Sequence, residues 1–177
     1  MMKYYLFAAA LFPALADAHP HGTVEQQLHL SLGRDMAELT WIIVPPAEQA
    51  GHLLAHLDLD GDSALDEAER AAFAQALVDA TLLSVNGEEV ALAESEAIVP
   101  DATAISQDAG RLEMTARSNL VLPTESFATL SVEVSYSEFS EDWFIQPFYF
   151  ENLADGASPR IERAPNALTV SIPAVAR

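Results

Sequence analysis

The sequence contains no cysteine, so disulfide bonds cannot stabilise the fold and thiol chemistry is excluded. Basic residues are also scarce: 8 Lys and Arg stand against 27 Asp and Glu, which gives a formal net charge of −19. Such a surface repels phosphate backbones and anionic lipid head groups and attracts cations. Nucleic acids and membrane surfaces are therefore not expected as partners, whereas a metal ion is.

The common sequence motifs of catalysis are missing as well. There is no G-x-S-x-G elbow, no H-E-x-x-H pair and no Gly-rich phosphate loop. Glu138, Glu141 and Asp142 lie beside Trp143 and Phe144, and paired carboxylates near aromatic residues could line a carbohydrate cleft. An acidic turn between two aromatic-rich strands explains the same residues. We therefore expect a protein that is not an enzyme, with a hydrolase as the third alternative.

No long apolar run follows the N-terminal segment, and none approaches the roughly 18 residues of a membrane span. Residues 1–18 combine a short basic start, an apolar run over 6–15 and Ala-Asp-Ala at 16–18, a pattern typical of a cleavable signal peptide. We expect a mature protein that begins at His19, is periplasmic or secreted, and does not insert into the membrane. Residues 19–177 have the length of one domain.

Apolar residues alternate with polar ones over much of this domain, which predicts β-strands. The strands are expected at residues 23–32, 36–44, 112–122, 127–136, 143–150 and 167–172, with a tight hairpin at 83–92 around Asn86-Gly87. Residues 101–110 and 152–165 are expected to be surface loops. Because strands and helices do not alternate regularly, the pattern favours an antiparallel, Ig-like β-sandwich.

A different pattern interrupts the strands at about residues 46–82. Leu53, Leu54 and Leu57 have helical spacing within 47–57, and apolar residues recur at helical spacing again over 67–82. The segment between these two patterns is acidic. We therefore expect a helix-loop-helix inserted into the sandwich.

The acidic segment 58–69 reads D-L-D-G-D-S-A-L-D-E-A-E and has the ligand spacing of an EF-hand calcium loop. Ca²⁺ takes six to eight oxygen ligands at roughly 2.3–2.6 Å, so oxygen donors must alternate along a tightly curved loop. The predicted ligands are Asp58, Asp60 and Asp62 at positions one, three and five, the Ala64 carbonyl at seven, Asp66 at nine and Glu69 at twelve. Leu65, at position eight, is expected to anchor the loop to the core.

This segment resembles the EF-hand family, and it departs from the family pattern at one position. Position six is normally Gly because the backbone there has a positive φ, but this chain has Ser63. A left-handed Ser costs on the order of 1 kcal/mol, which would weaken binding without removing a ligand. A lone EF-hand is commonly structural, so we expect structural Ca²⁺; an acidic turn that never loads metal is the alternative.

Four histidines form a second candidate metal site. His19 and His21 lie at the expected mature N-terminus, and His52 and His56 are four residues apart on the helix before the loop. Imidazoles suit Ni²⁺, Co²⁺, Zn²⁺ or Cu²⁺. Exposed helix residues and a frayed terminus explain the same pattern, because neither pair alone supplies the three or four ligands of a stable site.

The His-Pro-His start at 19–21, the loop at 58–69 and the hairpin at Asn86-Gly87 together resemble a group of exported bacterial proteins. They are also similar to the extracytoplasmic domain of HupE/UreJ-type permeases, over roughly the first half of the chain. That resemblance implies nickel or cobalt handling and a separate membrane permease as partner. A calcium-binding, non-enzymatic domain is the first hypothesis, and a transition-metal accessory protein is the second.

Overall fold

The fold is described from a computed structural model of the chain, for residues 24–106, 110–154 and 158–174. These ranges form ten strands and four helices, so the prediction of a mainly β fold is confirmed. The expected signal peptide at 1–18, together with His19 and His21, lies outside the described residues. In the described part of the chain, no helix has the length and apolar character needed to cross a membrane.

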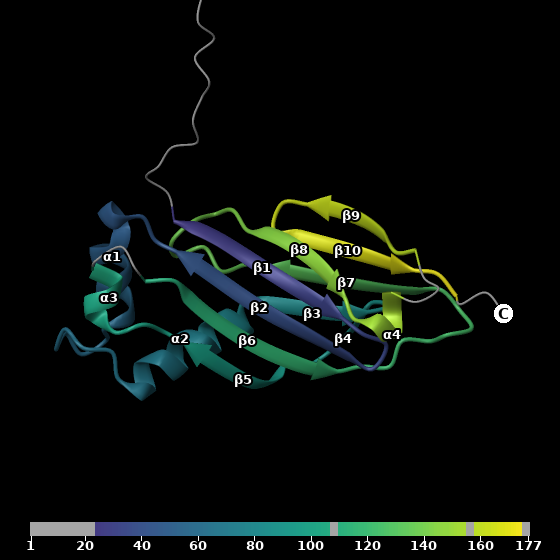
Figure 1. Ribbon diagram of the computed structural model, residues 1–177, viewed down its shortest axis with the longest axis horizontal. Helices are drawn as coiled ribbons and strands as arrows, with labels where there is room; N and C mark the ends of the chain where they lie inside the picture. The colour runs from purple at the N-terminus through teal and green to yellow at the C-terminus, as the bar shows by residue number, and fades with distance from the viewer. Residues whose placement is uncertain (1–23, 107–109, 155–157, 175–177) are drawn as a thin grey trace, which may run out of the picture.

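The first sheet contains five strands in the order β5-β6-β2-β1-β8 (Figure 1). Its strands are β1 (Glu25–Leu32), β2 (Met36–Val44), β5 (Ala93–Ile98), β6 (Leu112–Asn119) and β8 (Phe144–Tyr149). β1 and β2 form a hairpin whose turn is closed by a hydrogen bond from Gly33 N–H to Met36 O, at 2.8 Å. β2 lies at the centre of the sheet, between β1 and β6.

The second sheet contains five strands in the order β4-β3-β7-β10-β9. Its strands are β3 (Thr81–Val85), β4 (Glu88–Glu89), β7 (Ala128–Val134), β9 (Arg160–Ala164) and β10 (Ala167–Ile172). The predicted hairpin joins β3 to β4, and its turn residues Asn86 and Gly87 have φ values of 52° and 84°. A two-residue turn of this kind requires positive φ at both positions, which explains the Asn-Gly pair.

One strand pair departs from the predicted antiparallel arrangement, because β1 and β8 run parallel in register Gln27↔Phe144 to Leu32↔Tyr149. The other strand pairs described are antiparallel. β7, which precedes β8, belongs to the second sheet, so residues 135–143 connect strands of different sheets. A hairpin forces neighbouring strands to be antiparallel, whereas this longer connection does not.

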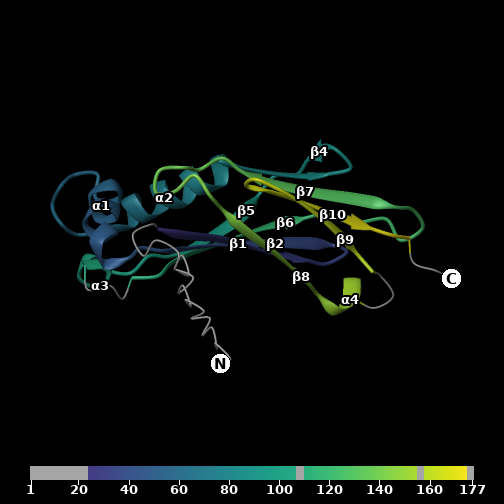
Figure 2. The ribbon, with the colours of Figure 1, turned by 90° about the horizontal axis from the view of Figure 1, so that it is seen from above.

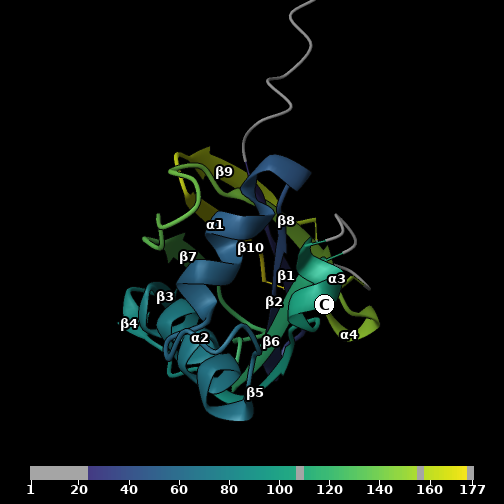
Figure 3. The same ribbon diagram turned by 90° about the vertical axis from the view of Figure 1, so that its left-hand side faces the viewer.

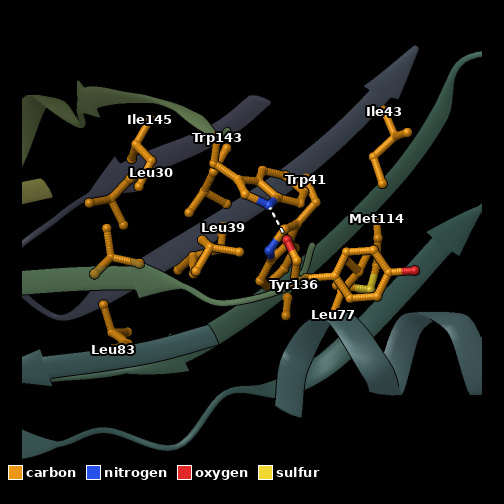
Figure 4. Packing of buried hydrophobic residues seen from close by; sticks show 14 of the residues in the cluster. Leu30, Leu39, Trp41, Ile43, Leu77, Leu83, Met114, Tyr136, Trp143 and Ile145 are labelled. Carbon is orange, nitrogen blue, oxygen red and sulfur yellow. Dashed lines mark hydrogen bonds between the residues drawn. The ribbon is translucent and has the colours of Figure 1, made fainter. Parts of the chain in front are cut away.

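A single hydrophobic cluster joins the two sheets, which Figure 2 shows as two layers. Every second side chain of β1, β2 and β6 is buried, and so is every second side chain of β7 and β10. Trp41 is fully buried in this cluster. Figure 4 shows the indole N–H of buried Trp143 donating to Tyr136 O at 2.7 Å, which satisfies both groups inside the core.

The two helices of the predicted helix-loop-helix lie at one end of the two sheets, seen from that end in Figure 3. Helix α1 (Ala47–Leu57) has the predicted bounds, and α2 (Glu67–Asp79) follows the acidic loop. Helix α2 ends three residues before the predicted position 82, because Thr81 already pairs with Val134 of β7. The helices pack against the core through their apolar sides, with Ala50, Leu53 and Leu57 of α1 and Phe73, Ala74 and Leu77 of α2 buried.

Four short elements were not predicted. β9 and the helices α3 (Ala102–Ser106) and α4 (Glu151–Ala154) lie in segments expected to be loops, and β5 was not assigned. All residues of β9 are exposed, so this strand has no apolar alternation that a sequence pattern could reveal. In α3 the Asp101 side chain accepts a hydrogen bond from Ala104 N–H at 2.8 Å, which caps a single turn.

The hydrogen bond of Trp143 gives a prediction about stability. We expect Trp143→Phe to lower the free energy of unfolding by about 1–3 kcal/mol, because the Tyr136 carbonyl would lose its buried donor. Chemical denaturation of both proteins measures this difference. Phe127→Leu, at a position that is 59% exposed, is the control and should stay within about 0.5 kcal/mol of the parent. An unchanged stability of Trp143→Phe would contradict this account of the core.

Candidate metal centre

The acidic loop spans the gap between α1 and α2. Asp58 ends α1, where its backbone N–H donates to Leu54 O at 2.9 Å. Asp66 begins α2 as its N-cap residue. Leu65 is only 8% exposed, which confirms the prediction that this residue anchors the loop to the core. The two ends and one internal residue are therefore fixed, and the remaining loop residues lie at the surface.

The loop backbone turns sharply at two positions with positive φ, 76° at Gly61 and 66° at Ser63. The second of these is the position where the EF-hand pattern predicts a left-handed residue. Ser63 adopts this conformation in spite of its Cβ atom, at a cost on the order of 1 kcal/mol. Gly61 adopts a similar conformation without that cost.

The first three aspartates of the loop point inward and hold the turn together. Asp58 Oδ1 accepts hydrogen bonds from Gly61 N–H at 2.7 Å and from Asp62 N–H at 3.2 Å, and its Oδ2 accepts from Ser63 N–H at 2.9 Å. Asp62 N–H also lies 3.1 Å from Asp60 Oδ1, and Asp62 Oδ1 accepts from Ala64 N–H at 2.7 Å. These bonds direct carboxylate oxygens toward the inside of the curve.

Glu69 closes the loop with a carboxylate that is almost entirely buried, since the residue is 8% exposed. Its Oε1 accepts a hydrogen bond from Leu59 N–H at 2.6 Å, and its Oε2 accepts from Asp66 N–H at 2.9 Å. In return, Asp66 Oδ1 accepts from Glu69 N–H at 2.9 Å, which completes a capping box at the start of α2. The side chain thus ties the first turn of α2 to the beginning of the loop.

Three of the predicted ligands come together. Oxygen atoms of Asp58, Asp60 and Glu69 lie within 4.8 Å of one another, as the EF-hand spacing predicts for positions one, three and twelve. Asp62 lies in the same loop outside this group, as does Asp66, whose carboxylate caps α2. The backbone N–H of Ala64 donates to Asp62 Oδ1, which fixes the backbone at loop position seven. Carboxylate oxygens at this separation suit a hard divalent cation such as Ca²⁺.

The electrostatics of this group also favour a cation. The Asp62 N–H that donates to Asp60 lowers the pKa of Asp60, but desolvation and the charges of Asp62, Glu69 and Asp58 outweigh it and raise that pKa above its usual value. The ion pairs found among the described residues are Arg111–Glu113 and Arg117–Glu38, and neither includes a residue of the loop. The carboxylates of the loop therefore repel one another, and no Lys, Arg or His within the described residues forms an ion pair with them.

A small pocket lies beside the loop, between α1 and α2. Its volume is about 320 Å³, and it is lined mostly by apolar and aromatic groups, namely Ala55, His56, Leu57, Leu59, Glu69, Ala72, Phe73 and Ala76. Leu59 is 70% exposed at its rim. Glu69 forms part of both the carboxylate group and this pocket, so the two features share a wall.

Of the predicted histidine site, the structure describes His52 and His56 on α1, while His19 and His21 lie outside the described residues. His52 is exposed on α1, whereas His56 is half-buried, with its Nε2 atom 3.2 Å from the Tyr136 hydroxyl and its ring 5.0 Å from that of Phe139. Burial raises the pKa of Tyr136, and the charge of Glu138 raises it further, so this phenol is neutral near pH 7. Both partners of His56 follow β7, with Tyr136 80 residues away in sequence, and no local pattern predicts these contacts.

The predicted acidic turn before β8 is held by hydrogen bonds that distant side chains donate to its backbone carbonyls. Gln26 Nε2 donates to the carbonyls of Ser140 and Asp142 at 2.9 and 3.2 Å, and Asn166 Nδ2 donates to Glu141 O at 2.6 Å. Glu138, Glu141 and Asp142 are exposed, and none of them belongs to the carboxylate group described above. These contacts favour the interpretation as a turn rather than as a catalytic pair.

No known family model matches the chain, and a search of curated proteins gives no match either.

The left-handed Ser63 leads to a prediction about metal affinity. We expect Ser63→Gly to bind Ca²⁺ more tightly, up to about fivefold, because Gly adopts a positive φ without the roughly 1 kcal/mol cost of a side chain. Calorimetric titration of both proteins measures the ratio. Ser63→Ala keeps the Cβ atom and is the matched control, so its affinity should equal that of the parent. Affinity that is equal or weaker in Ser63→Gly would contradict the assigned role of position six.

Proposed function

We propose that the protein is an exported, non-enzymatic calcium-binding protein. In this proposal an Ig-like β-sandwich carries an EF-hand-type helix-loop-helix, and Ca²⁺ stabilises that insertion. The observation that carries the proposal is the convergence of Asp58, Asp60 and buried Glu69 within 4.8 Å, and no basic residue of the described ranges forms an ion pair with any of them. Burial of an unpaired carboxylate is costly, and a bound cation would offset that cost.

The donor chemistry supports Ca²⁺ over other metals. The residues that would hold the ion are Asp58, Asp60, Asp62 and Glu69 through carboxylates and Ala64 through its carbonyl, with Asp66 acting through water. All of these donors are oxygen atoms, which suit Ca²⁺ and not the softer transition metals. Mg²⁺ is a smaller ion that demands near-octahedral geometry, whereas Ca²⁺ accepts six to eight oxygen ligands in more varied geometry and therefore suits this loop better.

Packing of the helices supports a structural role for the ion. Leu53 and Leu57 of α1 and Phe73 and Leu77 of α2 belong to the same hydrophobic cluster as the sheets. The insertion is thus part of the core, and fixing its loop stabilises the folded state as a whole. The N-terminal residues 1–18 are the basis for placing the protein in the periplasm or outside the cell.

Ca²⁺ is expected to raise the free energy of unfolding, because a ligand that binds only the folded state stabilises it. At a concentration one hundredfold above Kd the gain is about 2.7 kcal/mol. Thermal unfolding in a Ca²⁺ titration, with Mg²⁺ in a parallel series, measures the effect.

Two variants show whether that effect arises at the loop. Glu69→Gln keeps an oxygen acceptor for the capping box but removes the bidentate carboxylate, so it should fold and lose the response to Ca²⁺. Glu67→Gln removes an exposed carboxylate of the same helical turn and should keep the response. A parent protein whose melting temperature ignores Ca²⁺ would refute the proposal.

The second candidate function is a transition-metal accessory protein that works with a membrane permease. The observation in its favour is the placement of His52 and His56 one turn apart on α1. His52→Ala combined with His56→Ala should then abolish micromolar Ni²⁺ or Zn²⁺ binding and preserve the Ca²⁺ response. Tyr136→Phe is the control, because it removes the hydroxyl next to His56 and retains both imidazoles. If the parent binds neither metal in calorimetry, the accessory function fails.

A further inference from the structure

The outer face of the first sheet carries an unusual group of side chains along β8 and β1. Phe144 and Phe148 point away from the core and are 58% and 45% exposed. Three cross-strand pairs form this surface, which we call the aromatic face: Phe144 with Gln27, Gln146 with His29, and Phe148 with Ser31. Single exposed apolar residues are common on protein surfaces, whereas exposed apolar groups gathered on one face mark interaction sites.

Both aromatic rings are held in place by neighbouring side chains. The guanidinium of Arg163 lies over the ring of Phe144, 5.7 Å from its centroid. The ring of His29 meets that of Phe148 edge-on, with centroids 5.0 Å apart. Rings that are fixed before binding lose little conformational entropy when a ligand arrives, so the aromatic face is preorganised.

The free edge of β8 is a poor template for an added strand. Pro147 has no N–H to donate, and the carbonyl of Ile145 already accepts a hydrogen bond from Arg163. A strand added beside β8 would therefore find neither an N–H at Pro147 nor a free carbonyl at Ile145 to pair with. The side chains of the aromatic face, and not the edge of the strand, are the surface available to a ligand.

The charge of this surface selects the class of ligand. The chain has a net charge of −19, yet none of the six side chains of the aromatic face is a carboxylate. Glu25, one step along β1, accepts a hydrogen bond from Gln27 at 2.7 Å, and Glu38 beside Ser31 is paired with Arg117 at 2.7 Å. Arg163 beside Phe144 adds one positive charge to this region, but the acidic protein as a whole would repel an anionic ligand. A face without carboxylates also offers little to a cation.

We propose that the aromatic face binds a chain of a neutral polysaccharide. A sugar ring has an apolar C–H face, which is attracted to the negative face of an aromatic ring, and a rim of hydroxyl groups. The aromatic face offers the matching alternation, with rings at Phe144 and Phe148 and neutral hydrogen-bonding groups at Gln27, His29 and Gln146. Positions four apart in a strand are separated by about 13 Å, so the two rings would contact different units of an extended chain.

Affinity electrophoresis tests this proposal with the purified protein in native gels. The gels contain mixed-linkage β-glucan, xylan, galactomannan or glycogen as neutral probes and alginate as the anionic probe; insoluble cellulose and chitin are tested by co-sedimentation. We expect at least one neutral polysaccharide to retard or sediment the parent and alginate to have no effect. Failure of every neutral probe, or retardation by alginate alone, would overturn the proposal.

Variants assign the binding to this face. Phe144→Ala combined with Phe148→Ala should weaken binding about tenfold or more, and Gln146→Ala should weaken it without removing an aromatic ring. Phe127→Ala removes an equally exposed ring that lies outside the aromatic face, so binding should not change. Equal losses in all variants would show that binding is nonspecific. A parent dimer that Phe148→Ala dissociates would show instead that the face joins two copies of the chain, and would also overturn the proposal.

Discussion

The buried carboxylate of Glu69 is the group on which the helix pair depends. It accepts hydrogen bonds from the backbone N–H groups of Leu59 and Asp66, so one side chain joins the start of the loop to the start of α2. The same carboxylate lies within 4.8 Å of oxygen atoms of Asp58 and Asp60. Hydrogen bonds alone leave three negative groups close together, and a divalent cation would turn that repulsion into attraction.

The helix pair is connected to the sheets through apolar and aromatic contacts as well as through the chain. Phe73 of α2 lies 6.1 Å, between ring centroids, from Tyr136, whose hydroxyl approaches His56 of α1. The carbonyl of Tyr136 accepts the indole N–H of Trp143 in the core. Any stabilisation of the loop is thereby transmitted to the segment that connects the two sheets, which is why binding at the loop should affect global unfolding.

Local sequence patterns were sufficient for much of the fold and for the carboxylate group. Helix α1, the strand β2 and the Asn86-Gly87 turn follow from spacing and turn chemistry, and the ligand spacing predicted that Asp58 and Glu69 would meet. These features depend on neighbours within about twelve residues, as in the EF-hand loop.

Features that depend on distant contacts could not be predicted in this way. The parallel pairing of β1 with β8 depends on which sheet each strand joins, and the exposed strand β9 has no apolar pattern. The contact of His56 with Tyr136 spans 80 residues. This contact places the Tyr136 hydroxyl next to Nε2 of His56, one of the two imidazoles on α1 that the spacing suggests for a transition metal.

We propose above that the loop between α1 and α2 holds a calcium ion. A crystal structure of the protein grown with Ca²⁺ tests it most directly. We expect one ion in the loop, with six to eight oxygen ligands at roughly 2.3–2.6 Å, and both carboxylate oxygens of Glu69 among them. A well-ordered loop that contains only water in saturating Ca²⁺, or an ion held elsewhere, would contradict it.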